Sequence, residues 1–273
     1  MNFKNALVKT LVLVVLLFQG CSKKNSGPDE PEEKPVPLAK LKSVRPPDGP
    51  GGIDYYYNSN GRIDKVETRS GSDLMSVHDF VYKDGIVMSL NVSTPPPPRW
   101  KDPLEPYFKQ IYKYSGNQIV EVLIEKLGPQ PREDNSLVTL TYDSRGFIKT
   151  KKMEFLRSGG IIELVSIDRL TTDDKGNVTK IERDHYVRGA LAGTSVELRE
   201  YDNKINPLYK LVSPTNIDEY FNPNNRVKNT GFDQYGNPYP TVYEYEYNAE
   251  GLPVKQTTKT ALQTFDLLFD YYK

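Results

Sequence analysis

The chain of 273 residues has little of what most catalytic and metal sites need, with one cysteine, two histidines and one tryptophan. A single cysteine excludes an internal disulfide framework and a thiolate metal cluster. The charges also cancel, at 36 basic and 36 acidic residues. Nucleic acid is bound through a basic face, so we do not expect it as a partner.

Motifs for nucleophilic or zinc chemistry are missing as well. No Gly-x-Ser-x-Gly elbow and no His-Glu-x-x-His pair occurs, and His78 and His185 stand in separate parts of the chain with no motif around either. We therefore expect no enzymatic activity, no cofactor and no metal site.

Two carboxylate pairs are candidates for glycoside hydrolysis, Glu244 with Glu246 and Asp173 with Asp174. The first pair alternates with tyrosines along one stretch, which is typical of the solvated face of a strand. The second lies in a turn, where Asp is favoured for backbone reasons. Calcium binding at 173–177 or 58–61 is also disfavoured, because neither stretch has EF-hand spacing.

The N-terminus contains the one apolar run of note. Leu11–Phe18 is too short to span about 30 Å of hydrocarbon but has the length of a signal-peptide core. Phe18-Gln19-Gly20-Cys21 follows, and it resembles the lipobox of bacterial lipoproteins, with a small residue before the cysteine. Phe18 and Gln19 depart from the commonest version of that motif. We interpret residues 1–20 as a lipoprotein signal peptide and Cys21 as the site of lipidation.

Residues 21–40 are rich in proline and charge, which predicts a disordered tether between the lipid and a domain over 41–273. Ser22 is not the Asp that retains some lipoproteins at the inner membrane, so we expect the outer membrane. The acids at 29–33 resemble the surface-export tethers of Bacteroidota lipoproteins, which favours the cell surface over the periplasmic face.

The body of the chain repeats one unit, in which an alternating aromatic strand, a polar turn with glycine and a second alternating strand follow one another. The turn glycines are Gly61, Gly85, Gly116, Gly146, Gly176, Gly236 and Gly251. The central steps are thirty residues long, with one gap of sixty, and such a period indicates repeated supersecondary units. Each glycine supplies the positive φ of a tight hairpin.

These hairpins predict an all-β fold, an antiparallel meander that forms a large twisted, partly rolled sheet with both faces partly solvated. Residues 265–272 read as its closing strand. Two stretches do not fit the repeat. Ser93–Pro106 predicts an extended polyproline loop, and Pro207–Phe232, rich in Asn and Pro, predicts at most one helical turn near Ile217–Tyr220.

The Tyr-Asp-x-x-Gly-x-Ile core at 142–148 resembles the YD repeat of the RHS family. Residues 200–207 (EYDNKINP) resemble a motif of uncharacterised Bacteroidota lipoproteins that carry YD-like repeats. This resemblance implies stacked hairpins and an envelope location. It implies no catalytic residues, and the chain is too short for the closed cocoon of RHS toxins.

Tyrosines two residues apart share a strand face, at Tyr55/Tyr57, Tyr112/Tyr114 and Tyr243/Tyr245/Tyr247. Their rings suit stacking on a sugar or peptide, but they equally suit cross-strand packing over a thin sheet. Trp100, beside the proline run, is either an anchor for a partner or a clamp that holds its loop on the sheet.

Three functions stay open on this evidence. The first is a non-enzymatic, membrane-anchored module that binds a glycan or protein through Trp100, Tyr243, Tyr245 and Tyr247. The second is a carrier that holds an apolar ligand in a half-barrel, and the third is a hydrolase. A deep apolar concavity favours the carrier, a shallow groove of exposed tyrosines favours the binding module, and converging carboxylates favour the hydrolase.

Overall fold

The computed structural model describes residues 40–95, 103–127, 135–156, 162–210, 221–232 and 235–273. The expected leader, the tether, Cys21 and Trp100 lie outside the described residues, as does the helical turn expected near 217–220. The described residues all belong to one compact unit, 39–273.

Sixteen antiparallel strands form this unit. They are β1 (Leu41–Arg45), β2 (Gly52–Tyr57), β3 (Ile63–Ser70), β4 (Asp73–Lys83), β5 (Ile86–Thr94), β6 (Glu105–Ser115), β7 (Gln118–Lys126), β8 (Asn135–Tyr142), β9 (Ile148–Leu156), β10 (Ile162–Thr172), β11 (Val178–Val187), β12 (Ala190–Ile205), β13 (Asn224–Phe232), β14 (Pro238–Tyr247), β15 (Pro253–Lys259) and β16 (Thr264–Tyr271).

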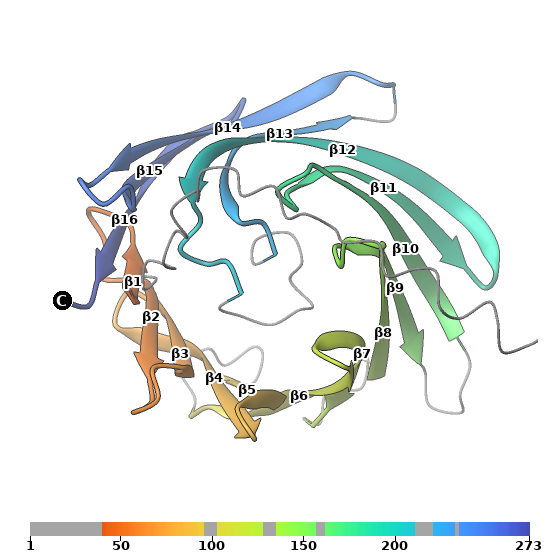
Figure 1. Cartoon of the computed structure of the whole chain (residues 1–273), viewed down its shortest axis with the longest axis horizontal. Coiled ribbons are helices and arrows are strands. Elements are labelled where there is room, and N and C mark those ends of the chain that lie inside the picture. The colour runs from red at the N-terminus through yellow and green to blue at the C-terminus, as the bar shows by residue number, and fades with distance from the viewer. Residues whose placement is uncertain (1–39, 96–102, 128–134, 157–161, 211–220, 233–234) are drawn as a thin grey trace, which may run out of the picture. The chain divides into compact units, whose positions relative to one another are not determined.

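The strands pair in chain order and then close into a barrel, because β16 also pairs with β1 (Figure 1). Val44 lies opposite Phe269, and Arg45 opposite Leu268. The all-β meander of hairpins is therefore confirmed, but the partly rolled open sheet is wrong. Closure pairs the two edge strands that an open sheet leaves with unpaired N–H and C=O groups.

The predicted turn glycines all have positive φ, between 58° and 94°. Six of them mark hairpin turns on one rim of the barrel, which we call the glycine rim. Gly236 is different, because the β13–β14 turn lies on the opposite rim. The missing step of the thirty-residue period falls instead at Asn206, in the connection from β12 to β13.

Four turns of the glycine rim share one hydrogen-bonded geometry. The first residue of each, Asn58, Asp143, Asp173 or Asn248, accepts two backbone N–H bonds at its side-chain Oδ1, from the residues two and four positions later. These bonds stabilise the turn and explain why its first residue is Asp or Asn.

The aromatic residues that precede the turns form a ring of tyrosines around the barrel. On seven hairpins a β-bulge directly precedes the last inward residue before the turn, which is Tyr57, Tyr82, Tyr114, Tyr142, Thr172, Tyr201 or Tyr247. Five of these phenols, and that of Tyr271, donate to a backbone carbonyl one hairpin earlier or on β1: Tyr57 to Leu41 (3.0 Å), Tyr82 to Ile63 (2.6 Å), Tyr114 to Val87 (2.7 Å), Tyr142 to Ile119 (2.6 Å), Tyr201 to Val178 (2.8 Å) and Tyr271 to Pro253 (2.8 Å). The bonds link successive hairpins side by side.

The inward face is mainly apolar from β1 to β9, and many charged side chains lie on the outward face. The inward face from β1 to β9 forms a core that includes Tyr55, Leu90 and Val122 and packs against Leu208 and Phe221 of the β12–β13 connection. Outward residues form ion pairs, such as Lys42 with Asp270 (2.9 Å). The expectation that both faces are partly solvated is therefore wrong for the inward face of this half of the barrel.

Strands extend into both stretches that did not fit the repeat. β5 includes Ser93 and Thr94, and β6 begins at Glu105, so the proline loop is shorter than the expected Ser93–Pro106. β13 occupies 224–232 of the stretch that was not expected to hold a strand.

Removing one phenol should weaken the tyrosine ring measurably. Tyr142→Phe leaves the Ile119 carbonyl without its donor, and we expect a loss of about 1–2 kcal/mol in the free energy of unfolding at pH 7. Burial raises the pKa of Tyr142 from 10.0 to about 12. The neutral phenol is thus favoured on folding, so its stabilisation is complete below pH 10 and is lost as the pH rises through 12.

Denaturant unfolding of the variant and wild type should therefore differ most at neutral pH and converge between pH 10 and 12. Tyr239→Phe, at an exposed tyrosine, is the control and should change stability by less than about 0.5 kcal/mol. Equal stability of Tyr142→Phe and wild type at pH 7 would contradict a structural role for the ring.

Candidate functional site

The interior of the barrel is divided by the connection between β12 and β13. Its described parts, 206–210 and 221–223, lie inside the ring of strands (Figure 1). Leu208 and Phe221 pack against the barrel core. A sixteen-stranded barrel is too wide for inward side chains alone to fill. This inward segment occupies part of the remaining space.

Buried asparagines hold the inward segment to the strands. Asn177 has no exposed surface, and its amide nitrogen donates to Asp173 Oδ2 (2.8 Å) and Asn224 Oδ1 (3.0 Å). Its Oδ1 accepts the backbone N–H of Asn224 at 3.0 Å. Asn222 Oδ1 accepts the N–H of Val178 at 2.7 Å.

A second group of bonds fixes the EYDNKINP motif to the same place. Asn206 Nδ2 donates to the carbonyl of Asn222 at 2.9 Å, and its Oδ1 accepts the N–H of Leu208 at 2.9 Å. Asp202 accepts the N–H of Asn225 at 3.2 Å and also accepts a short bond from the Tyr247 hydroxyl. The Asn-rich stretch is thus an internal anchor of the barrel, and the sequence alone did not indicate this role.

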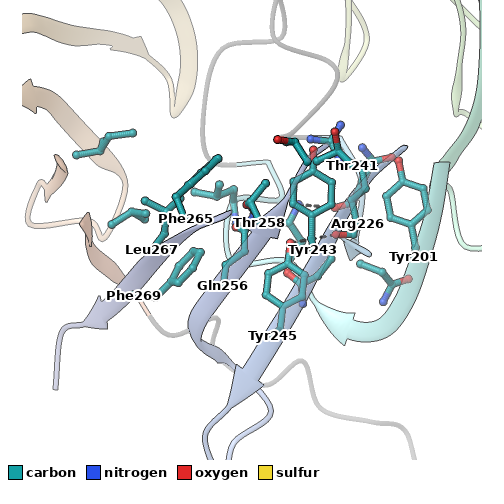
Figure 2. Close-up of a pocket in the computed structure, with 18 of the residues that line it drawn as sticks. Tyr201, Arg226, Thr241, Tyr243, Tyr245, Gln256, Thr258, Phe265, Leu267 and Phe269 are labelled. Carbon is teal, nitrogen blue, oxygen red and sulfur yellow. Dashed lines mark hydrogen bonds between the residues drawn. The ribbon is translucent and has the colours of Figure 1, made fainter. Parts of the chain in front are cut away.

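A cavity of about 480 Å³ lies on one side of the inward segment; we call it the aromatic cavity (Figure 2). Its aromatic and aliphatic lining comes from β1, β2, β12, β14, β16 and the inward segment: Val44, Ile53, Tyr55, Tyr201, Leu208, Tyr243, Tyr245, Phe265, Leu267 and Phe269. Its polar lining consists of Asn206, Asn222, Asn224, Asn225, Arg226, Thr241, Gln256, Thr258 and Thr260. The volume is in the range of small-molecule sites, about 300–1,000 Å³.

Arg226 is the one charged residue among the described residues that line the aromatic cavity. Its guanidinium carbon lies 4.9 Å from the centroid of the Tyr243 ring, which is a cation–π contact. Its backbone carbonyl accepts a bond of 3.1 Å from the hydroxyl of Tyr245. The ring and the bond position this cation at the side of the cavity opposite Phe269 (Figure 2).

A second cavity, of about 460 Å³, lies near the glycine rim on the other side of the inward segment. Tyr82, Tyr114 and Tyr142 of the tyrosine ring line it, together with Tyr209 and Phe221. These phenols already donate to backbone carbonyls, so their role here is structural.

The structure separates the four residues expected to bind a ligand. Tyr243 and Tyr245 both line the aromatic cavity. Tyr247 stacks on Tyr245, with ring centroids 5.8 Å apart, and its hydroxyl is engaged by Asp202 and Asn225. Trp100 lies outside the described residues. The tyrosines thus face the interior, which differs from a shallow external groove.

The candidate carboxylates do not converge on a cleft. Glu244 and Glu246 lie on the outward face and contact Lys259 (2.5 Å) and Lys255 (3.6 Å). His78 faces inward, where burial holds its pKa below the usual value against the opposing charge of Asp79.

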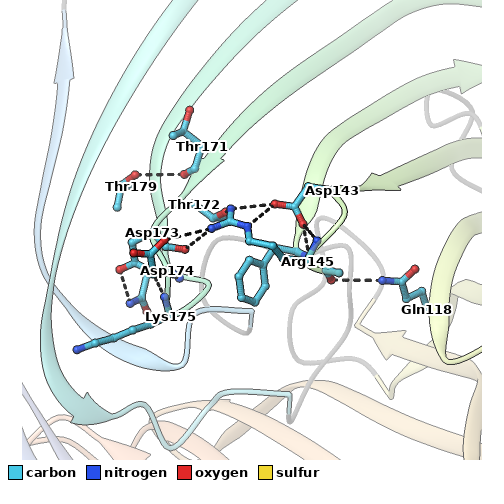
Figure 3. A network of polar contacts seen from close by, with 12 residues as sticks. Gln118, Asp143, Arg145, Thr171, Thr172, Asp173, Asp174, Lys175 and Thr179 are labelled. Atoms are coloured by element: carbon cyan, nitrogen blue, oxygen red, sulfur yellow. Dashed lines mark hydrogen bonds and ion pairs between the residues drawn. The ribbon is translucent and has the colours of Figure 1, made fainter. Parts of the chain in front are cut away.

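Asp173 and Asp174 belong to a polar network that joins neighbouring turns along the glycine rim (Figure 3). Asp173 Oδ1 accepts the N–H groups of Lys175 and Asn177, so it serves the turn geometry. Arg145 of the preceding turn donates to Thr172 Oγ1 at 2.7 Å and lies 3.5 Å from Asp174. Arg145 thereby links the fourth turn to the fifth, at the hairpin where threonine replaces the ring tyrosine.

The hydrogen bonds of this network stabilise the charged form of Asp143. Burial opposes ionisation there, but the N–H of Phe147 and the guanidinium of Arg145 hold the pKa of Asp143 below its usual value. Within the described ranges, no three His, Cys, Asp or Glu side chains are placed to hold a metal ion. Among the same residues, no helix is long and apolar enough to cross a membrane.

Comparison with known proteins gives structural neighbours without a family. No protein-family model and no curated protein matches the sequence. A weak alignment to the TcdB2-TccC3-TEV crystal structure, with a TM-score of 0.31 and 15% identity over 79% of this chain and 12% of that one, carries no argument. The resemblance to YD repeats stays a prediction from the motifs.

Two crystal structures align along nearly their whole length. A porin-like protein from Bacteroides vulgatus matches with a TM-score of 0.57 and 10% identity, covering 86% of this chain and 99% of that chain. A porin-like protein from Bacteroides uniformis matches with a TM-score of 0.53 and 10% identity, covering 87% and 99%. The described barrel is therefore similar in fold to porin-like proteins of Bacteroides.

Proposed function

We propose that this chain is a lipid-anchored envelope protein whose barrel binds a small amphipathic molecule in the aromatic cavity and catalyses no reaction. The observation that carries the proposal is the cavity itself, which lies against the inner wall of the barrel and is lined by both aromatic and polar side chains. Of the functions left open by the sequence, the carrier fits this geometry better than a glycan-binding surface.

The charged outer face of the barrel favours a binding protein that stands in water rather than a pore that spans the membrane. Outward ion pairs include Lys65–Glu67 (2.7 Å), Lys255–Asp266 (3.0 Å) and Arg169–Asp184 (2.5 Å). A transmembrane barrel has the reverse arrangement, with apolar residues outside and polar residues within. One lysine or arginine on the lipid face near the bilayer centre costs about 2–4 kcal/mol.

The two porin-like neighbours support an envelope location by analogy of fold, and the expected leader supports it independently. The outer membrane is the proposed site of attachment, through lipid on Cys21. Exposure on the cell surface is proposed from the acidic residues that follow the cysteine.

A neutral amphipathic probe tests the cavity directly. We expect 6-phenylhexanamide to bind the full-length, detergent-solubilised protein with saturable heat in isothermal titration calorimetry, after subtraction of a detergent blank. Gln256→Trp should weaken binding by about tenfold or more, because the indole fills space within the cavity. Lys259→Trp places the same ring on the outward face of β15 and is the matched control.

Circular dichroism and melting temperature confirm that both variants are folded. Absence of saturable binding to the wild type, or equal weakening by the two variants, would overturn the proposed site.

A further inference from the structure

The charges inside the barrel point to a specific class of ligand for the aromatic cavity. Two other interior arginines have acidic partners on the same wall. Arg183 donates to both carboxylate oxygens of Asp168, at 2.6 and 2.9 Å, and Arg199 contacts Glu197 at 2.5 Å. Their charges are neutralised where they stand, as buried charges must be.

Arg226 differs from these two arginines. Among the residues that the structure describes, none of the carboxylates forms an ion pair with its guanidinium, and the nearest recorded partner is the face of Tyr243. A cation–π contact satisfies one face of the planar group but uses none of its N–H donors. Those donors lie in the plane of the group, in a fork that matches a carboxylate or a similar anion.

The rest of the cavity matches a neutral, apolar body. Phe265, Leu267 and Phe269 form a row on β16, and Gln256 and Thr258 of β15 separate this row from Arg226 and Tyr243 (Figure 2). Thr258 is buried and accepts a bond of 3.0 Å from Gln256 Nε2, so these two polar groups partly satisfy each other. The cavity thus has a cationic side and an apolar side with neutral polar groups between them.

We propose that the aromatic cavity binds an organic acid, with its anionic group on the Arg226 guanidinium and its ring or hydrocarbon chain against Phe265, Leu267 and Phe269. This inference rests on the proposed binding function and adds the charge of the ligand. An acid neutralises the one charged side chain among the described residues that line this cavity, whereas a neutral ligand of the same shape leaves it unpaired. The preference for acid over neutral analogue is therefore a measurable property of Arg226.

A matched pair of probes tests it. 6-Phenylhexanoate and 6-phenylhexanamide have the same body and differ in the charge of one end group. We expect the wild-type, full-length protein to bind the acid about tenfold or more tightly at pH 7. Arg226→Gln should remove this preference by weakening the acid and leaving the affinity for the amide within about twofold. Arg226→Lys should retain part of the preference, because a charge remains without the planar fork.

Arg169→Gln is the control for net charge, since it removes an arginine from the outward face, where Arg169 contacts Asp184. It should leave both affinities unchanged. Equal affinity of the wild type for acid and amide, or equal weakening of both by Arg226→Gln, would overturn the inference while leaving the cavity as a binding site. Failure of both probes to bind would instead overturn the proposed function.

Discussion

Asn177→Ala should destabilise the barrel by about 2–4 kcal/mol and release the inward segment from the wall. The substitution removes three hydrogen bonds from a side chain with no exposed surface. It leaves the backbone N–H and the side-chain oxygen of Asn224 without these partners, and an unsatisfied buried polar group costs about 1–3 kcal/mol. Alanine cannot restore any of the bonds.

The effect should be local before it is global. Hydrogen exchange measured by mass spectrometry should show faster exchange in peptides that cover 206–210 and 221–225, with smaller changes in β3 to β6. Asn203→Ala is the matched control, because Asn203 is an exposed asparagine three residues before Asn206. A uniform increase in exchange along the barrel, or unchanged stability, would show that Asn177 does not anchor the segment.

Release of the segment should also alter the two cavities that it separates. Leu208 lines the aromatic cavity, and Tyr209 and Phe221 line the second cavity. We therefore expect Asn177→Ala to weaken probe binding in the aromatic cavity, although Asn177 itself does not line it. Unaltered binding together with faster exchange at 206–210 and 221–225 would mean that the strands alone form the site.

The repeat was readable from the sequence because its physical causes are local. A tight turn needs positive φ at glycines such as Gly61 and Gly146, and Asn58 or Asp143 satisfies the N–H groups that each turn exposes. The tyrosine before the turn was visible as a pattern, but its acceptor is one hairpin away. Its role in joining hairpins required the pairing of strands to be known.

Closure of the barrel and the position of the inward segment could not be predicted from the sequence, because both depend on contacts between residues that are far apart in the chain. Nothing near Val44 or Phe269 specifies that these residues, 225 positions apart, lie opposite each other. The Asn-rich stretch resembled a loop because its asparagines satisfy one another only after Asn177 and Asn224 are brought together across 47 residues. Gly236 fitted the thirty-residue period by number while lying on the other rim.

Tyr243 and Tyr245 were identified from their spacing, which places them on one strand face. Whether that face lies inside or outside depends on the whole barrel. Arg226 was not identified as a site residue. Its place on the inward face can be inferred only once β13 is known to be a strand. The interior polarity of β12 to β15 therefore comes from the structure.

Cys21→Ser should transfer the protein completely from the membrane fraction to the soluble fraction. Acyl chains bind a bilayer with about 0.8 kcal/mol for each buried CH₂ group, so a protein carrying several chains stays attached and one carrying none does not. The proposal places the outer face of the described barrel, with pairs such as Lys42–Asp270 and Lys259–Glu244, in water, so it gives the barrel no second attachment to the bilayer. The anchor should therefore account for all of the attachment.

Cell fractionation with mass spectrometry of the N-terminal peptide measures this outcome, and Ser22→Ala is the control, expected to remain acylated and membrane-bound. The experiment separates two barrels that share one fold. A barrel that crosses the membrane with its strands stays in the pellet after Cys21→Ser and resists alkaline washing, because its outer face contacts lipid. A barrel whose ion pairs face water leaves with the supernatant. Retention of the unlipidated variant would thus contradict both the anchor at Cys21 and the assignment of the charged face to water, and it would favour a pore.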